Sequence, residues 1–439
     1  MRSSVFVLAL LGVLSRAQAP VPSPAAPAPD DPIKTLVERL DLEKYKATVK
    51  ALTRFGDRRQ GTARNRAALD WIEAQLKSYG CTNTERITYT FTPRPPGGRG
   101  RGATIDPATG EPVPAPAQPA ATGTGQRGGQ GAGQGAGRDG GRGAADPTAA
   151  QGGGRIRGTR ARRPVNSSAE AQPDPKLREL NTEQTTAGPG PRQDVFCTKV
   201  GTTHPDEMYI VGAHMDGIGW GEAANDDGSG TALVMELARV FSSPDVKTER
   251  SIRFALWNNE ESGTEGAGAY VAQRSELQGK EDPPGSGKYP EPKWLGMIQH
   301  DMMMFDHGMP REDGTVSKEQ RPEADVNVEF AKTSKFAADA QALAWVLHAA
   351  NEKYATDYPA AVGPHMTNTD SRQFQEVVAA VSLRENERGA QIGAGWDPQW
   401  HQPTDLFVTY SDKDFRLGLN AAQTTLGAVA QLTRATLKK

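Results

Sequence analysis

Residues 251–257 read SIRFALW, and two adjacent carboxylates, Glu260 and Glu261, follow after two asparagines. A short apolar run rich in β-branched and aromatic residues is typical of a buried β-strand. Proteins with alternating strands and helices gather their active groups just beyond the carboxyl ends of the strands. The stretch therefore predicts a central strand that presents a pair of carboxylates for metal binding or proton transfer.

Four further motifs lie on either side of this strand in the sequence. They are HMD at 214–216, NDDGSG at 225–230, MIQHDM at 297–302 and HQPTD at 401–405. With the two glutamates they offer two imidazoles and three carboxylates for metal, and one spare carboxylate for proton transfer, which is what a two-metal hydrolase needs. Oxygen and imidazole ligands without a thiolate suit zinc in a catalytic rather than a structural site.

The chain between these motifs alternates between strand and helix patterns. Apolar runs at 208–213 and 294–299 resemble the run at 251–257, and helical spacing separates them at 229–241 and 267–274. Further helices are expected at 32–53, 64–78, 334–354 and 413–437, and further strands at 86–91, 194–200 and 377–383. Such alternation predicts an α/β fold with a mostly parallel mixed sheet and helices on both faces.

In this order, the five motifs resemble those of the M28 family of zinc peptidases, which are di-zinc aminopeptidases and their relatives. The resemblance covers roughly residues 36–92 and 186–436 and implies a single zinc-exopeptidase-like domain. One departure is Ala223, which stands where the family usually has a glycine two residues before the asparagine of its NDDGSG-type motif.

The resemblance also assigns roles to particular residues. It implies five ligands for two zinc ions: His214, Asp226, Glu261, Asp301 and His401. Asp226 would bridge both ions, since metals about 3.5–4 Å apart require a shared ligand. His214 and Asp301 would be the remaining ligands of one zinc ion, and His401 and Glu261 would be the remaining ligands of the other. Glu260 would be the general base on a metal-bridging water and would pass the proton to the leaving amine.

Three more carboxylates are candidates for supporting these ligands. Residues two apart on an extended chain point the same way, so Asp216 is expected to accept a hydrogen bond from the free ring nitrogen of His214. Asp405 is expected to brace the loop that holds His401. Asp370 lies in TDSRQF at 369–374, which is similar to a family segment of the type Ser-Asp-x-x-x-Phe, and a supporting acidic role follows from that resemblance.

The remaining segments suggest export and an insertion. Residues 1–19 have the pattern of a signal peptide, so we expect an exported protein with no membrane anchor after cleavage. Residues 20–35 are rich in Pro and Ala and are interpreted as a linker to a peptidase domain at 36–436. Residues 93–190 interrupt that domain and are poor in core-forming residues, so they are predicted to be a disordered insertion, and residues 95–185 to be dispensable for catalysis.

Charge and cysteine content narrow the classes of function further. The 439 residues carry a net charge of −2, but residues 94–163 hold 11 Arg against 4 acidic residues, which leaves −9 for the rest. No nucleic-acid partner is expected, because the basic insertion lacks aromatic residues for stacking. Only Cys81 and Cys197 are present, and they form either one disulfide or two buried thiols. The resemblance favours the disulfide, because the strands next to these cysteines pair in that fold.

These observations predict an exported di-zinc metallopeptidase that acts on peptides, most simply an aminopeptidase that removes N-terminal residues. The choice of aminopeptidase comes from the resemblance, since carboxypeptidase-like and dipeptidase relatives share the metal ligands. Two alternatives remain: a glutaminyl cyclase-like enzyme with one zinc ion, and a binding ectodomain built on an inactive peptidase fold. The cyclase lacks the NDDGSG string, and a dead fold would have lost ligands.

Overall fold

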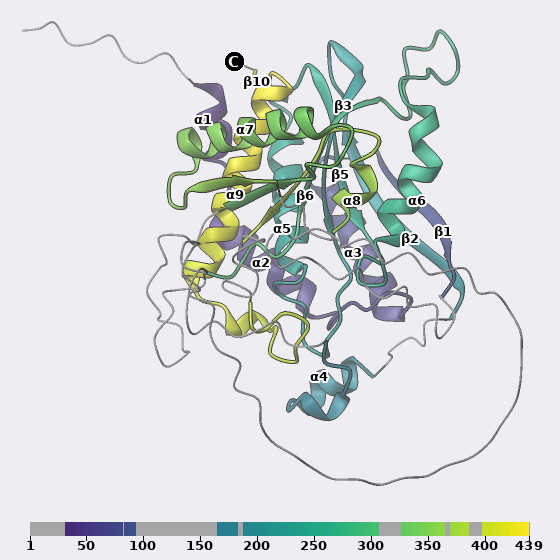
Figure 1. Ribbon diagram of the computed structural model, residues 1–439, viewed down its shortest axis with the longest axis vertical. Helices are drawn as coiled ribbons and strands as arrows, with labels where there is room; N and C mark the ends of the chain where they lie inside the picture. Colours follow the sequence, from purple (N-terminus) through teal and green to yellow (C-terminus); the bar gives the residue numbers. More distant parts are fainter. Residues whose placement is uncertain are drawn as a thin grey trace, which may run out of the picture. The chain divides into compact units, whose positions relative to one another are not determined.

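The computed structural model describes residues 31–81, 83–93, 165–182, 188–306, 326–364, 369–385 and 397–438 (Figure 1). The described residues from 32 onward form one compact unit. The expected signal peptide lies outside the described residues, as do most of the expected linker and residues 94–164 of the insertion. No helix in the described ranges is long and apolar enough to cross a lipid bilayer.

An eight-stranded sheet forms the centre of this unit. Its strands, in spatial order, are β1 (Thr84–Phe91), β2 (Gly190–Lys199), β5 (Arg250–Trp257), β3 (His204–His214), β6 (Lys293–His300), β9 (Ala380–Arg384), β7 (Val326–Phe330) and β8 (Ala360–Gly363). The four central strands β5, β3, β6 and β9 run parallel. Antiparallel pairings join β1 to β2, β2 to β5 and β9 to β7. The predicted mixed, mostly parallel sheet is confirmed.

Side chains alternate between two cores on the two faces of the sheet. On β5, Ile252, Phe254 and Leu256 belong to the larger core, whereas Ala255 and Trp257 belong to the smaller one on the other face. This is the period of two that an extended strand imposes. Because both faces of β5 are covered, the strand contains a nearly continuous apolar run.

Helices cover both faces. The larger core packs against α1 (Pro32–Val37), α2 (Leu42–Thr53), α3 (Ala63–Ser78), α5 (Gly228–Phe241), α7 (Ala337–Tyr354) and α9 (Asp412–Leu432). The smaller core packs against α6 (Glu265–Arg274) and the short α8 (Ser371–Phe374). A separate two-stranded sheet joins β4 (Val246–Lys247) to β10 (Thr436–Leu437).

Some element boundaries differ from the sequence-based expectation. The helix expected at 32–53 is two helices, because the side chain of Asp41 caps a new N-terminus by accepting from the backbone N of Lys44. The first of them, α1, includes residues assigned to the linker and buries Leu36 and Val37. The last helix, α9, ends at Leu432 rather than continuing to 437. Strands β7 and β8 were not predicted.

The predicted disorder of 93–190 is wrong for residues 165–182, which form an ordered segment with the helix α4 (Pro175–Leu180). The segment buries Leu177 and two amide side chains, Gln172 and Asn181, both of which are 0% exposed. Its anchoring depends mainly on hydrogen-bonded amides, so a search for large apolar residues could not detect it. The dispensability of residues 95–185 for catalysis stays a prediction, and the buried contacts of 165–182 bear directly on it.

The disulfide between Cys81 and Cys197 is present, with a Cα–Cα distance of 6.0 Å. Strands β1 and β2 pair antiparallel, and Thr84 lies opposite Cys197 in the register. The bond thus joins the chain just before β1 to β2, on the two sides of the insertion.

Candidate metal centre

The carboxyl ends of the parallel strands bring the sequence motifs together. His214 is the last residue of β3, Asp301 directly follows β6, and Glu261 follows β5. Asp226 lies just before α5, and His401 lies in the loop that leads to α9. Residues separated by up to 187 positions in the sequence therefore meet at one edge of the sheet.

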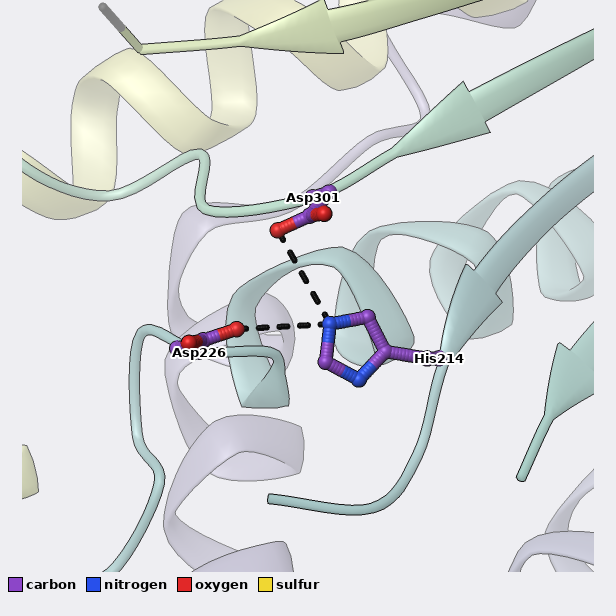
Figure 2. Close-up of side chains that lie close together, drawn as sticks. All are labelled: His214, Asp226 and Asp301. Atoms are coloured by element: carbon purple, nitrogen blue, oxygen red, sulfur yellow. Dashed lines mark ion pairs between the residues drawn. The ribbon is translucent and has the colours of Figure 1, made fainter. Parts of the chain in front are cut away.

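Two groups of potential ligands form there, and they share Asp226. In the first, Nε2 of His214 lies 3.3 Å from Oδ1 of Asp226 and 3.8 Å from Oδ1 of Asp301 (Figure 2). In the second, Nε2 of His401 lies 2.9 Å from Oδ2 of Asp226 and 2.8 Å from Oε2 of Glu261. Each oxygen of Asp226 thus faces a different histidine, which is the arrangement that a ligand shared by two cations requires.

The chemistry of these atoms fits metal ions. Within the described part of the chain, Oε1 of Glu261 is buried without a hydrogen-bond partner, and Oδ2 of Asp226 is buried with the His401 ring nitrogen beside it. A buried carboxylate oxygen without a donor is costly unless a cation compensates it. Imidazole and carboxylate together, without a thiolate, are the ligands of catalytic zinc sites.

The pKa values of the metal-free site show how much negative charge is concentrated there. Burial lowers the pKa of His401, but Glu261 and Asp226 outweigh it and raise that pKa to about 9. Burial raises the pKa of Glu261 to about 7. The pKa of His214 is also raised, because Asp227 and its neighbouring carboxylates outweigh burial. Protons therefore occupy positions that a bound cation would take, and metal binding should release them.

Glu260 lies beside these groups and belongs to neither. Burial raises its pKa well above the usual value, and the Glu261 and Asp301 carboxylates add to the shift while His214 opposes it. The residue is partly exposed, and its backbone N donates to Oδ1 of Asp216 at 3.1 Å. A carboxyl with a raised pKa, placed outside the ligand groups, is suited to take up and release a proton.

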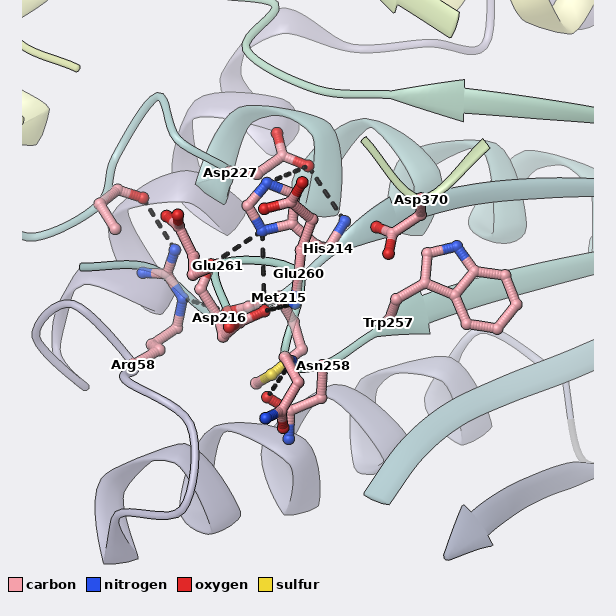
Figure 3. A network of polar contacts seen from close by, with 12 residues as sticks. Arg58, His214, Met215, Asp216, Asp227, Trp257, Asn258, Glu260, Glu261 and Asp370 are labelled. Atoms are coloured by element: carbon pink, nitrogen blue, oxygen red, sulfur yellow. Dashed lines mark hydrogen bonds and ion pairs between the residues drawn. The ribbon is translucent and has the colours of Figure 1, made fainter. Parts of the chain in front are cut away.

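Of the three expected supporting carboxylates, Asp216 makes a different contact from the one predicted. Nδ1 of His214 donates to the backbone carbonyl of Asp216 at 3.0 Å, while the Asp216 carboxylate lies 3.7 Å away and instead holds the backbone of Glu260 (Figure 3). Because a carbonyl oxygen can only accept, Nδ1 must carry a proton in this hydrogen bond, and Nε2 remains available as a metal ligand. Asp370 accepts from Nε2 of Gln299 at 3.0 Å.

Asp405 braces the loop of Asp226 as well as its own. Its carboxylate accepts from the backbone N of Asn225 at 2.8 Å, from that of Asp226 at 3.2 Å and from the Tyr410 hydroxyl at 2.9 Å. The loop that carries His401 thus holds the shared ligand in place by direct hydrogen bonds. Burial raises the pKa of Asp405 to about 7.

Several residues of the site were not predicted from the sequence. The guanidinium of Arg58 is buried and donates to the carbonyls of Met215 at 2.8 Å and Ala223 at 2.8 Å, which joins the chain after His214 to the chain before Asp226 (Figure 3). Arg384 binds Oδ2 of Asp301 and leaves Oδ1 facing His214. Asp227 caps α5 with one carboxylate oxygen, and its other oxygen accepts from the backbone N of His214.

Left-handed backbone conformations are concentrated near the ligands. His401 has φ 54°, Met302 after Asp301 has φ 59°, and Asn259 before Glu260 has φ 63°. Non-glycine residues in this region carry a cost of about 1 kcal/mol or more each, and they cluster at functional sites. Ala223 has φ 48°, which explains why glycine is usual at its position in the resembled family.

The edge of a mostly parallel sheet thus carries two groups of imidazole and carboxylate ligands, each of which could hold a metal ion, as metal-dependent hydrolases require. The chain belongs to peptidase family M28, whose profile matches residues 194–417, just over half of the sequence. Family membership and the aminopeptidases among its relatives support a zinc-dependent hydrolase.

Individual relatives match over shorter stretches. Aminopeptidase YwaD of Bacillus subtilis is 42% identical over 75 residues, which cover 17% of this chain and 16% of that protein. Carboxypeptidase Q of Xenopus laevis is 34% identical over 71 residues, 16% of this chain and 15% of that protein. The chain thus matches less than a fifth of the length of these curated relatives. A solved zinc aminopeptidase from Bacillus subtilis shares the fold, with a TM-score of 0.53 and 15% identity over 91% of this chain and 96% of that one.

Proposed function

We propose that this protein is an exported aminopeptidase that uses two zinc ions. The observation that carries the proposal is the division of Asp226 between two ligand groups, one with His214 and Asp301 and the other with Glu261 and His401. A site for one ion would need only one of these groups. The names of relatives support the choice of aminopeptidase, although a carboxypeptidase also appears among them.

The residues divide the chemistry between them. Bound zinc would supply a Lewis acid that polarises the scissile carbonyl and lowers the pKa of a water molecule. Glu260 would accept a proton from the attacking water and deliver it to the amine that leaves. Glu260 suits this role because it lies beside both ligand groups and belongs to neither, so it can carry the proton while the ligands stay in place.

Two observations support export. The disulfide between Cys81 and Cys197 is the kind of bond that persists in oxidising compartments outside the cytosol. The pattern of residues 1–19 provides the second, independent argument from the sequence.

The decisive experiment combines metal analysis with a set of small substrates. We expect purified protein to hold two zinc ions per chain and to hydrolyse an aminoacyl-p-nitroanilide but not its N-acetylated form. Removal of metal by a chelator should abolish this activity, and added zinc should restore it. Cleavage of only C-terminal residues from N-capped peptides would contradict the aminopeptidase assignment.

The same preparation tests the other candidate functions. Peptides with N-terminal glutamine that cyclise with one bound zinc ion would indicate a cyclase, and folded protein without metal and without turnover would indicate a binding domain. We expect neither result, because the site retains both ligand groups.

A further inference from the structure

The 165–182 segment lies against two loops of the metal site. One is the loop at 217–222, which precedes Asp226, and the other is the loop at 401–405, which carries His401. The backbone N of Asn166 donates to the carbonyl of His401 at 3.1 Å, and its side chain donates to the carbonyl of Gly219 at 3.2 Å. Asn181 donates to the carbonyl of Gly221 at 2.8 Å. The segment therefore contacts the metal site through the backbone of its loops.

Gln172 uses all the polar atoms of its side chain in hydrogen bonds. Its side chain is 0% exposed, and its amide nitrogen donates to the carbonyls of Trp220 at 2.7 Å and Pro403 at 3.0 Å. Its amide oxygen accepts from the backbone N of Asp174 at 3.1 Å. Both donors of the amide are used, one on the loop at 217–222 and one on the loop at 401–405. A single side chain thus cross-links these two loops.

The two loops also approach each other with almost no side chains between them. A Cβ on Gly219, whose φ is +105°, would lie 2.4 Å from the carbonyl carbon of His401, and one on Gly221 would lie 2.7 Å from the carbonyl oxygen of Gln402. Backbone packed this closely depends on hydrogen bonds for its alignment, and those of the Asp405 carboxylate to the backbone of Asn225 and Asp226 are among them. Gln172 supplies two more.

The two groups of metal ligands do not depend equally on the contact between the 217–222 loop and the 401–405 loop. The His401 group takes His401 from one loop and Asp226 from the continuation of the other, and their atoms lie 2.9 Å apart. The His214 group consists of His214, Asp226 and Asp301, and none of these comes from the 401–405 loop. Movement of that loop would therefore separate His401 from Asp226 directly, whereas it would reach the first group only through the hydrogen bonds of Asp405 to the backbone of Asn225 and Asp226.

We propose that Gln172 is a positioning residue of the peptidase site: it fixes the 401–405 loop against the 217–222 loop and thereby holds His401 within reach of the metal it shares with Asp226. This inference rests on the proposed two-metal function. It assigns part of the insertion to the catalytic unit, although residues 165–182 supply no ligand. The alternative is that Gln172 contributes to general stability alone.

A pair of matched variants separates these possibilities. Gln172→Leu removes both donated hydrogen bonds at similar volume. Asn351→Leu does the same in the core between α7 and α9, where the buried Asn351 amide donates to the carbonyl of Tyr358 at 3.0 Å and to the hydroxyl of Thr424 at 2.9 Å. Asn166→Ala is a milder change in the 165–182 segment, because that residue is only half-buried.

The measurement is zinc affinity by chelator competition, with near-UV circular dichroism to confirm folding. We expect Gln172→Leu to weaken one of the two zinc ions at least tenfold and leave the other within twofold of the unaltered protein. Asn166→Ala should weaken the same ion several-fold, and Asn351→Leu should weaken neither. A His401→Ala variant identifies which ion has been weakened, since it should abolish that position.

Equal zinc affinities in Gln172→Leu and Asn351→Leu would overturn the positioning role, as would weakening of the ion that remains in His401→Ala. A failure of the proposed function would look different, because the unaltered protein would then bind fewer than two ions. With one ion, the inference stands only if Gln172→Leu weakens that ion relative to Asn351→Leu.

Discussion

Asp226 is the one residue that belongs to both groups of candidate metal ligands. Its carboxylate is held between two histidines, and its backbone is fixed by Asp405. The His401 and His214 imidazoles keep its pKa below the usual value despite burial, so it is ionised and ready to bind cations. Loss of this one side chain should affect both metal groups together.

Substitution of Asp226 by Ala is therefore expected to lower zinc content at both positions. The reason is that two cations would lose the anion between them. Metal analysis after dialysis provides the test, with Asp414→Asn, a change to the buried capping residue of α9, as the control. Loss of only one equivalent would show that Asp226 is a terminal ligand.

Glu260→Gln should keep both zinc ions and lose turnover. Gln is nearly isosteric but cannot accept the proton, and loss of a general base costs roughly 10²–10⁴-fold in kcat. Zinc content and kcat on an aminoacyl-p-nitroanilide should be measured on the same sample, with Glu261→Gln for comparison. If Glu260→Gln loses zinc and Glu261→Gln does not, the roles of the two glutamates are reversed.

Sequence reasoning at the residue scale located the groups that have local motifs. Four of the predicted ligands, His214, Asp226, Glu261 and Asp301, follow strands or open a helix, so their neighbours in the chain carry a recognisable pattern. Arg58, Gln172 and Arg384 have no such pattern, because two of them bind backbone carbonyls and the third pairs with Asp301 across the fold. A carbonyl is present at every position, so no residue type in the sequence indicates which one will be bound.

Strand β6 shows how one element combines structure and chemistry. It ends at His300, whose ring contacts the carbonyl of Gly212 at 3.1 Å and the hydroxyl of Thr425 at 2.8 Å, and the next residue is the candidate ligand Asp301. Burial lowers the pKa of His300 to about 4, against a slight opposing effect of Gly212. The imidazole is therefore neutral in the folded protein at neutral pH and links β6 to β3 and α9.

This predicts an acid-sensitive contribution to stability. The folded pKa of His300 is below the unfolded value of 6.5, so its contribution is complete above pH 6.5 and is lost as the pH falls towards about 4. Between pH 7.5 and 5 the loss should be on the order of 2 kcal/mol. Urea unfolding of metal-free protein at both pH values, with and without His300→Gln, checks this. An identical pH dependence in the two proteins would contradict it.

At the element scale the long, strongly patterned segments were predictable and the short ones were not. Strands β3, β5 and β6 are apolar on both faces, and α5 and α9 are long helices with an apolar side. Strand β7 reads VNVEF, a five-residue alternation that would predict a half-buried strand, yet it buries Asn327 and Glu329 as well. Its tertiary position between β9 and β8 explains the burial, and the sequence alone carries no sign of that position.

At the scale of the whole molecule, the basic residues and the candidate metal ligands lie in different parts of the sequence. Residues 94–163 are strongly basic and the rest is acidic. All members of the two ligand groups, and Gln172, lie outside residues 94–164. Strands β1 and β2, on the two sides of the insertion, pair directly.

Replacement of residues 94–164 by a flexible Gly/Ser linker should therefore preserve both zinc ions and kcat on a small aminoacyl substrate. Removal of 94–182 should not, because Gln172 and Asn166 would be lost with their contacts to the two loops. Zinc content and kcat of the two deletion proteins should be compared directly. Equal behaviour of the two would show that the 165–182 segment is not needed for the site.

The disulfide gives this architecture tolerance to cleavage of its own backbone. Cys81 precedes the insertion and Cys197 follows it, so a protease that cuts anywhere in 94–164 produces two fragments that remain covalently joined. Such a two-chain form would migrate as one species on a non-reducing gel and as two after reduction. It would keep the paired strands β1 and β2 and every ligand, so an exported enzyme of this design could be nicked by neighbouring proteases without being inactivated.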